Sequence, residues 1–203
     1  DRGHAVSIYE KASELGGQLI QAGTAPFKWP VRDYKEWLIR QVKKRDIDVK
    51  LEVEATPELL KNAGYDSIIA ANGAVPKVTP IPGADLEHVM TAFSVYGNED
   101  KVRGSVVIIG GSETGVETGI YLAELGHHVT VLTRQNELAH DGNRVHYYEM
   151  LRDRWQQSGN FHFILSAKTK KITKSGVFYE DENGNEIELI ADTILLSGGM
   201  RPL

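Results

Sequence analysis

The chain has 203 residues, 41% of them hydrophobic and 25% charged, and a formal net charge of −5, which suits one large or two small globular domains and argues against nucleic-acid or membrane-surface binding. It contains no cysteine, which excludes disulfides, thiolate catalysis and cysteine-ligated zinc or iron–sulfur clusters within this stretch and fits a cytoplasmic location. No apolar run reaches the roughly 18 residues that a membrane span needs.

The first half of the chain predicts short strands alternating with helices. Thr56, followed by Pro57 and Glu58, is typical of a helix start with the threonine as N-cap. Residues 75–83 hold prolines at 76, 80 and 82, and we expect them to form a connection without secondary structure. The predicted strands cover residues 4–9, 47–53 and 67–71, the last of them buried, and a predicted helix covers residues 31–44.

The second half begins after a boundary near residues 98–104 and repeats this pattern. Residues 105–109 predict a strand that is continuously apolar from Val106 onward, as expected when both sheet faces are covered. Residues 168–190 predict antiparallel strands with a hairpin turn at Asn183-Gly184. Further predicted strands cover residues 128–132, 161–165 and 192–197, and predicted helices cover residues 116–125 and 144–157. The sequence therefore predicts an α/β fold with Rossmann-like parallel sheets and a three-stranded β-meander.

The strongest local motif lies in residues 106–134, where a strand, a glycine turn, a helix and a second strand follow one another. This is the context that a dinucleotide-binding fingerprint requires. The helix N-terminus would offer free backbone N–H groups and a positive dipole end to a pyrophosphate. Gly110 permits the tight turn, and Gly115 lets the helix pack close to the strand. The candidate nucleotide-binding residues of the turn are Gly110, Ser112, Glu113, Thr114 and Gly115.

Two positions depart from the G-x-G-x-x-G pattern. Ser112 occupies the second glycine site, where its Cβ crowds the phosphate although its hydroxyl could donate to a phosphate oxygen. The next strand ends in Thr133 instead of a carboxylate that would bind the ribose 2′-OH, and Arg134 follows it. These residues favour NADP(H) over NAD(H), while an unused or ADP-only site stays open.

A second motif is an apolar strand that ends in Glu10, followed by a loop with Gly16, Gly17 and Gln18. In a Rossmann half, a carboxylate at this strand end accepts hydrogen bonds from an adenosine ribose. An acidic strand end alone is more often a solvated terminus, so this motif depends on its context.

That context is a resemblance that covers nearly the whole chain. The chain resembles the C-terminal part of the two-flavin Old Yellow Enzyme relatives, which have the pyridine-nucleotide–disulfide reductase fold and include 2-enoate reductase, 2,4-dienoyl-CoA reductase and trimethylamine or histamine dehydrogenase. The matching stretches follow the family's order and are GHAVSIYEKASELGGQL, VEATPELL, YDSIIAANGAVP, VVIIGGSETGVETGIYLAELGHHVTVL and ADTILLSGGMRPL.

The resemblance implies that FAD contacts are spread over the chain. Glu10 would bind the adenosine ribose with Lys11 beside it, and Ala55 would touch the adenine through its backbone. The other implied FAD-site residues are Gly17 and Gln18 near the pyrophosphate and flavin, Ala71 and Gly73 near the phosphates, and Gly198 and Gly199 in the return strand.

The resemblance also implies a domain plan. Residues 1–102 would form an FAD-binding unit, residues 103–190 an inserted NAD(P)-binding unit, and residues 191–203 the return strand to the FAD unit. The family's FAD unit opens with a strand and a glycine motif upstream of the first matching stretch, so we expect a fragment that is inactive alone and does not retain FAD. FMN and a 4Fe–4S cluster are expected only in absent parts of the parent protein, including an FMN barrel on which this part would pack.

The implied activity is that of an FAD-dependent NAD(P)H oxidoreductase. Hydride would move from NAD(P)H to FAD and on to a second flavin or iron–sulfur centre, commonly for reduction of an enoate or enoyl-type substrate. No catalytic side chain and no metal ligand is predicted in this chain. Two alternatives stay open, namely a non-catalytic ADP-binding structural module of an amine-dehydrogenase-like flavoprotein and a single-flavin NADH oxidase or ferredoxin reductase.

Overall fold

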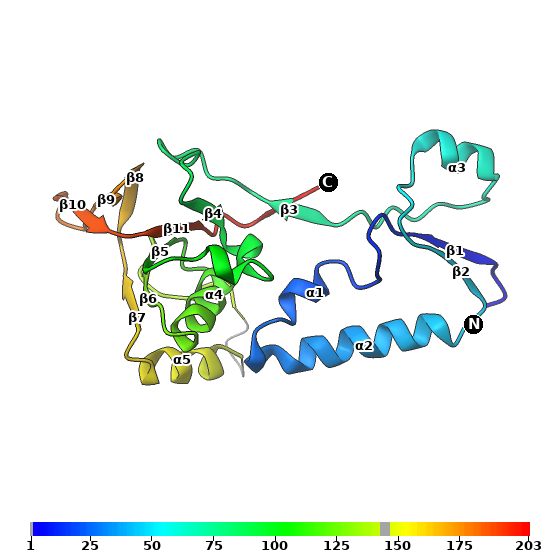
Figure 1. Ribbon diagram of the computed structural model, residues 1–203, viewed down its shortest axis with the longest axis horizontal. Helices are drawn as coiled ribbons and strands as arrows, with labels where there is room; N and C mark the ends of the chain where they lie inside the picture. The colour runs from blue at the N-terminus through cyan, green and yellow to red at the C-terminus, as the bar shows by residue number, and fades with distance from the viewer. Residues whose placement is uncertain (1, 143–146) are drawn as a thin grey trace. The chain divides into compact units, whose positions relative to one another are not determined.

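The computed structural model describes residues 2–142 and 147–203 (Figure 1). The chain divides into two compact units, one of residues 1–73 with Leu203 and the other of residues 74–202. This division comes earlier than the boundary that the sequence predicts, because the proline-rich connection groups with the second unit. The assignment of the units to particular cofactors depends on which residues bind nucleotide, and it stays a prediction.

The first unit contains a small parallel sheet and three α-helices. Its two strands pair in parallel, with Val6 opposite Ile47. The unit therefore keeps the strand–helix–strand order that the sequence predicts. Its elements are β1 (Val6–Tyr9), α1 (Leu19–Ala22), a 3-10 helix (Pro26–Lys28), α2 (Trp29–Lys43), β2 (Ile47–Lys50) and α3 (Pro57–Ala63).

The ends of α3 follow from its sequence. The side-chain oxygen of Thr56 accepts a hydrogen bond from the Leu59 N–H at 3.2 Å, which satisfies one of the backbone donors left free at a helix start. Gly64 ends the helix in the left-handed conformation, with φ of 69°. The prediction of Thr56 as N-cap is confirmed.

The prediction of a buried strand at residues 67–71 is wrong. The structure assigns no strand there, and the side chains of Ile68 and Ile69 are 57% and 91% exposed. A strand is ordered by ladder hydrogen bonds from a neighbour, and within the described residues the sheet of this unit consists of β1 and β2 alone. An apolar run is compatible with a strand, but the strand forms only where a neighbouring strand is available for pairing.

The second unit is built on a five-stranded parallel sheet in the order β4-β11-β5-β6-β7. Its strands are β4 (Val89–Thr91), β5 (Ser105–Ile109), β6 (His128–Leu132), β7 (Phe161–Ile164) and β11 (Thr193–Leu196). Its helices are the 3-10 helices Ala92–Val95 and Glu99–Lys101, α4 (Glu113–Glu124) and α5 (Tyr147–Gln157). The predicted helical residues before Tyr147 lie outside the described residues.

The two faces of this sheet are covered differently. Helix α4 packs on one face so closely that a Cβ at Gly119 would lie 2.8 Å from the Phe161 ring. On the other face, Val107 and Ile194 of the parallel sheet pack with Val177 of the meander in one buried cluster. Residues 106–109 are therefore apolar at consecutive positions, because both faces of β5 are covered there.

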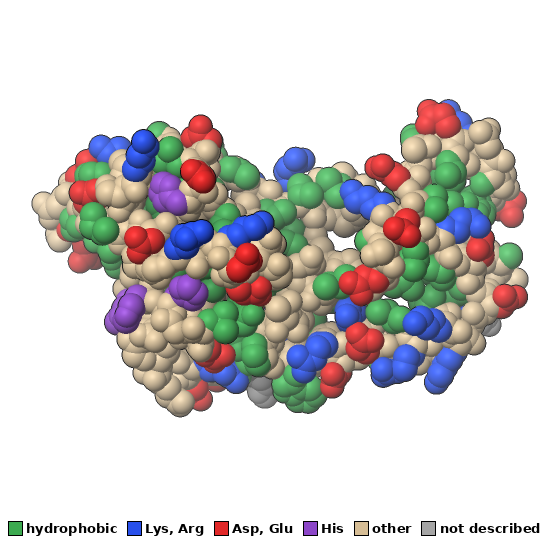
Figure 2. Space-filling model, viewed as in Figure 1, with side chains coloured by type: hydrophobic (Ala, Val, Ile, Leu, Met, Phe, Trp, Pro, Cys, Tyr) green, Lys and Arg blue, Asp and Glu red, His purple; other side chains and the backbone are tan. Residues whose placement is uncertain are grey.

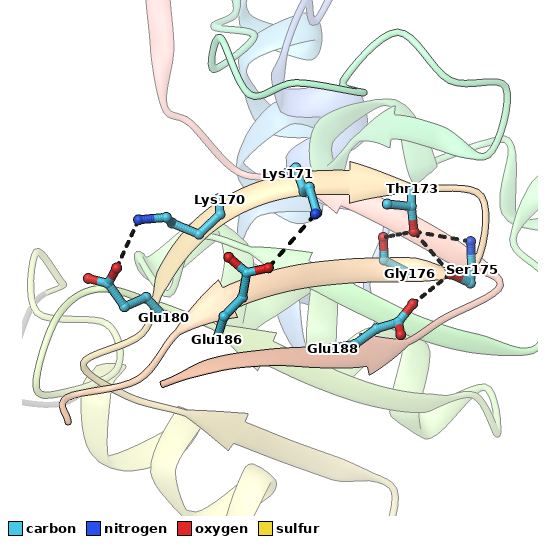
Figure 3. A network of polar contacts seen from close by, with 8 residues as sticks. All are labelled: Lys170, Lys171, Thr173, Ser175, Gly176, Glu180, Glu186 and Glu188. Atoms are coloured by element: carbon cyan, nitrogen blue, oxygen red, sulfur yellow. Dashed lines mark hydrogen bonds and ion pairs between the residues drawn. The ribbon is translucent and has the colours of Figure 1, made fainter. Parts of the chain in front are cut away.

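The meander consists of β8 (Lys168–Thr173), β9 (Gly176–Glu180) and β10 (Glu186–Ile190), which pair antiparallel in the order β10-β9-β8. The β9–β10 turn contains Gly184 in the left-handed conformation, with φ of 83°, and the predicted hairpin is confirmed. Its polar side chains form the network of hydrogen bonds and ion pairs drawn in Figure 3.

One prediction in this unit is wrong in part. The expected structureless connection at residues 75–83 begins in a strand, because β3 (Ala74–Pro76) pairs antiparallel with β12 (Met200–Pro202). Pro76 is tolerated in β3 because proline, which lacks an N–H donor, is found on edge strands, and both strands of this two-stranded sheet are edge strands.

The face shown in Figure 2 carries acidic and basic side chains interspersed with one another. Within the described part of the chain, no helix combines the length and apolar character that a membrane crossing demands.

Candidate dinucleotide-binding site

The glycine turn after β5 is shaped by close backbone approaches. Gly110 has φ of 118°, and a Cβ there would overlap the carbonyl oxygen of Ser197. A Cβ at Gly115 would overlap the carbonyl oxygen of Gly110. Both positions therefore require glycine, and helix α4 begins directly against the end of its strand.

The start of α4 holds an acidic side chain from a distant segment. Ser112 is the N-cap residue and has extended backbone, with φ of −67° and ψ of 172°, but its side chain makes no capping hydrogen bond. The Glu113 N–H instead donates to Asp141 Oδ1 at 2.9 Å, while Thr114 is exposed. The expectation that the amides at this helix start are free is therefore wrong for Glu113.

The segment that carries Asp141 is docked on the glycine turn. The Ala139 N–H donates to the Gly111 carbonyl at 2.7 Å, and the Gly142 N–H closes a turn on the Ala139 carbonyl at 2.9 Å. Leu138 is 4% exposed, and a Cβ at Gly111 would lie 3.1 Å from its Cδ2 atom. These contacts hold the turn and the segment together.

The two residues predicted to set nucleotide specificity, Thr133 and Arg134, follow β6 and differ in exposure. Thr133 is 5% exposed, and its hydroxyl accepts the Gln135 N–H at 3.2 Å. A Cβ at Gly111 would lie 2.8 Å from the Thr133 Cβ, so this side chain packs beneath the glycine turn. Arg134 is exposed.

The sheet topology places the turn at a ligand-binding position. The chain leaves β5 toward β6 on one side, while β11 lies on the other, so the carboxyl end of β5 is a topological switch point. A small open pocket of about 20 Å³ lies there. It is lined by Pro76, Ala92, Phe93, Thr114, Leu196, Ser197, Gly198, Gly199 and Met200.

In the first unit, the residues predicted to bind FAD are only partly brought together. The carboxylate of Glu10 accepts the Ala12 N–H at 2.8 Å and thereby orders its own loop. A Cβ at Gly73 would lie 4.0 Å from Gln18 Nε2, so these two predicted residues are near one another. Gly17 has φ of 50°. The remaining candidates of this unit, Lys11, Ala55 and Ala71, are exposed.

Comparison with known proteins identifies the family. Residues 36–203 match the family model described as pyridine nucleotide-disulphide oxidoreductase. The chain belongs to this family. It is 31% identical over 201 residues to bilirubin reductase of Mediterraneibacter gnavus, covering 99% of this chain and 31% of that protein. It is 32% identical over 200 residues to cinnamate reductase of Clostridium sporogenes, covering 98% of this chain and 30% of that protein.

A solved structure agrees with this membership. The structure of a 2-naphthoyl-CoA reductase complex superimposes with a TM-score of 0.92 at 28% identity, over 98% of this chain and 30% of that chain. The predicted resemblance and fold class are confirmed. The chain spans about a third of the length of these relatives, so the activity of a whole protein is a matter of proposal.

The described side chains include a buried polar group that the sequence did not predict. Glu117 in α4 is 6% exposed and accepts a hydrogen bond from the Tyr147 hydroxyl. Burial, and then the negative charge of Glu117, raise the pKa of Tyr147 far above its ordinary value.

A second such pair lies further along α4. The Tyr121 hydroxyl donates to Glu99 Oε1 at 3.0 Å, and burial together with this bond raises the pKa of Tyr121 to about 12. Both tyrosines stay protonated at neutral pH and act as donors that fasten α4 to its neighbours. The partners are 30 and 22 residues apart in sequence, and no local pattern signals them. No group of three potential metal ligands occurs in the described ranges, 2–142 and 147–203.

Proposed function

We propose that the chain is the dinucleotide-binding part of an FAD-dependent NAD(P)H oxidoreductase, in which hydride moves from NAD(P)H to FAD and electrons pass on to a second flavin or iron–sulfur centre. One observation carries this proposal. The pocket at the switch point is lined both by Thr114 of the proposed NAD(P) turn and by Gly198 and Gly199 of the proposed FAD return segment. Residues assigned to two cofactors thus meet at one place.

The chain's own contribution to such chemistry is binding and orientation, since bound flavin and nicotinamide supply the reactive atoms. Gly110 and Gly115 bring the start of α4 against the strand end, where backbone amides of residues 112–115 would hold a pyrophosphate. Ser112 would add its hydroxyl. In the first unit, Glu10 and the residues near Gly17 would bind the FAD adenosine and pyrophosphate.

The substrate would be reduced outside this chain. Relatives named for cinnamate and 2-naphthoyl-CoA reduction support an enoate- or enoyl-type substrate. The roughly 30% coverage of these relatives supports a larger parent, in which this part packs on an FMN-bearing barrel in the cytoplasm. Exposure of Ile68 and Ile69 supports our view that the first unit needs further partners before it retains FAD.

The nucleotide choice would be set at the end of β6, where Arg134 is exposed and no carboxylate is present. A cationic guanidinium is attracted by the negative charge of a 2′-phosphate, which a 2′-hydroxyl lacks. We expect calorimetric titration to show NADPH binding roughly 10-fold more tightly than NADH.

Arg134→Ala should bring the ratio of the two affinities close to one. Arg103→Ala is a matched control, because Arg103 is exposed at the amino end of β5, opposite the proposed site. Equal affinities in the unsubstituted chain, or tighter NADH, would contradict the proposed preference.

A non-catalytic, ADP-binding structural module is the second candidate. The contact of Asp141 with the Glu113 amide favours it, because a pyrophosphate would need that amide. The buried Thr133 side chain, which is engaged with Gln135, points the same way. Failure of both NADPH and NADH to bind would support this candidate over the first.

A further inference from the structure

Residues 138–142, named here the capping turn, form an ordered feature on the candidate site. Leu138 and Ala139 are 4% and 0% exposed, and the turn closes through the Gly142–Ala139 hydrogen bond. Ala139 adopts φ of 47°, a left-handed conformation that alanine seldom takes and that persists only when surrounding contacts enforce it. The capping turn is therefore held in place by its contacts with the glycine turn.

This held conformation presents negative charge to the start of α4. Asp141 Oδ1 lies 2.9 Å from the Glu113 backbone nitrogen and accepts its N–H. The carboxylate of Glu113 lies at the same turn, since a Cβ at Gly142 would be 2.9 Å from Glu113 Oε2. The positive end of the helix dipole thus already has an anionic partner from within the chain.

A phosphate oxygen and the Asp141 carboxylate would need the same donor. Anions bind helix starts through the first backbone N–H groups, and Glu113 supplies one of these groups in the 12-residue helix α4. Two anions cannot share one N–H at hydrogen-bonding distance without strong repulsion.

We propose that Asp141 is a built-in competitor of the dinucleotide. Its carboxylate holds the Glu113 amide in the nucleotide-free chain, and a pyrophosphate oxygen must replace it on binding. This inference rests on the proposed function, because it presumes that the glycine turn receives a dinucleotide. It assigns to the capping turn a role in weakening nucleotide affinity.

The test is calorimetric titration of NADPH into the chain and its Asp141→Asn and Asp141→Ala variants. Removing the carboxylate should tighten binding by roughly 3- to 10-fold, as expected for one charge at a helix end. Asparagine keeps an acceptor oxygen for the Glu113 amide. Asp141→Asn should therefore retain the capping turn even if Asp141→Ala loosens it. Thermal unfolding of each variant checks that the fold persists.

Asp85→Asn provides the control for net charge. Asp85 is exposed and precedes β4, at the amino end of the parallel sheet and therefore away from the start of α4. The Asp85→Asn variant should bind NADPH with the same affinity as the unsubstituted chain. If the unsubstituted chain binds NADPH and neither Asp141 variant binds it more tightly, the competitor role is overturned and the proposed function stands. If neither NADPH nor NADH binds to the unsubstituted chain or to any variant, both are overturned.

Discussion

At the scale of single residues, the site depends on backbone geometry that few side chains permit. Gly110 and Gly115 have no room for a Cβ, since the carbonyl oxygens of Ser197 and Gly110 lie where one would be. Thr133 lies under the same turn and is buried. The turn therefore resists substitution whether or not a ligand is bound.

Asp192 gives a prediction about pH. Its carboxylate accepts hydrogen bonds from the Ser105 N–H at 2.8 Å and hydroxyl at 2.9 Å, and these bonds lower its pKa. A lowered folded-state pKa stabilises the fold above the unfolded value of about 3.9, and this stabilisation is lost as pH falls through the folded value. Asp192→Asn should therefore lower the Tm near pH 7, and this difference in Tm should shrink progressively as pH falls below about 3.9.

Circular dichroism melts of both proteins across this pH range measure the effect. Asp181→Asn is not a suitable control, because hydrogen bonds also lower the pKa of Asp181. Asp85→Asn is suitable, because Asp85 is exposed and lies outside this contact. A difference in Tm that is the same at neutral and acid pH would refute the role given to Asp192.

Residue chemistry could be predicted from sequence where it is local. The spacing of Gly110 and Gly115 indicates the tight turn, and Thr56 before Pro57 indicates the helix start. Asp141 could not be predicted, because it lies 28 residues from Glu113 and belongs to no motif. Such a contact depends on how the capping turn docks, which is a property of the packed fold.

At the scale of elements, the two faces of the meander contribute differently to stability. On its solvent face, Lys170 and Glu180 form an ion pair at 2.8 Å that Figure 3 shows at the edge of the network. On the other face, Ile172 is 4% exposed and belongs to the cluster that joins the meander to the parallel sheet. Burying a large apolar side chain stabilises a fold by about 1.5–3 kcal/mol, whereas an exposed ion pair contributes about 0–1 kcal/mol.

Ile172→Ala should therefore destabilise the fold by about 2–5 kcal/mol, because it leaves a cavity in this cluster. Lys170→Met, at the exposed bulge of the same strand, should leave the free energy of unfolding nearly unchanged. Urea unfolding of the two variants makes the comparison. Equal losses of stability would show that the solvent face matters as much as the core.

A helix or strand could be predicted where its own residues determine it, and was missed where it depends on a partner remote in sequence. Residues 105–109 and 128–132 coincide with β5 and β6. In β5 the run from Val106 to Ile109 is continuously apolar, as a strand covered on both faces requires. Residues 67–71 show the same apolar character without a neighbouring strand, and they form none. The β3–β12 pair was missed because each strand is three residues long and its partner is remote in sequence.

At the scale of the whole molecule, the two units differ in how completely they bury their apolar residues. In the second unit, Ile108, Leu122 and Ile194 are at most 1% exposed. In the first unit, large apolar side chains such as Trp29 and Ile69 are 56% and 91% exposed. We therefore expect the second unit to carry most of the stability of the chain.

The most direct test of dinucleotide binding is to follow backbone amide signals by NMR during titration with NADPH. If the glycine turn binds the dinucleotide, the largest shifts should occur at Glu113, Thr114 and Gly115, with smaller shifts at Arg134 and Asp141. Gly115→Ala, whose Cβ would overlap the Gly110 carbonyl oxygen, should abolish them. Saturable shifts confined to other parts of the chain, or none at these amides, would contradict the assignment of the glycine turn as the nucleotide site.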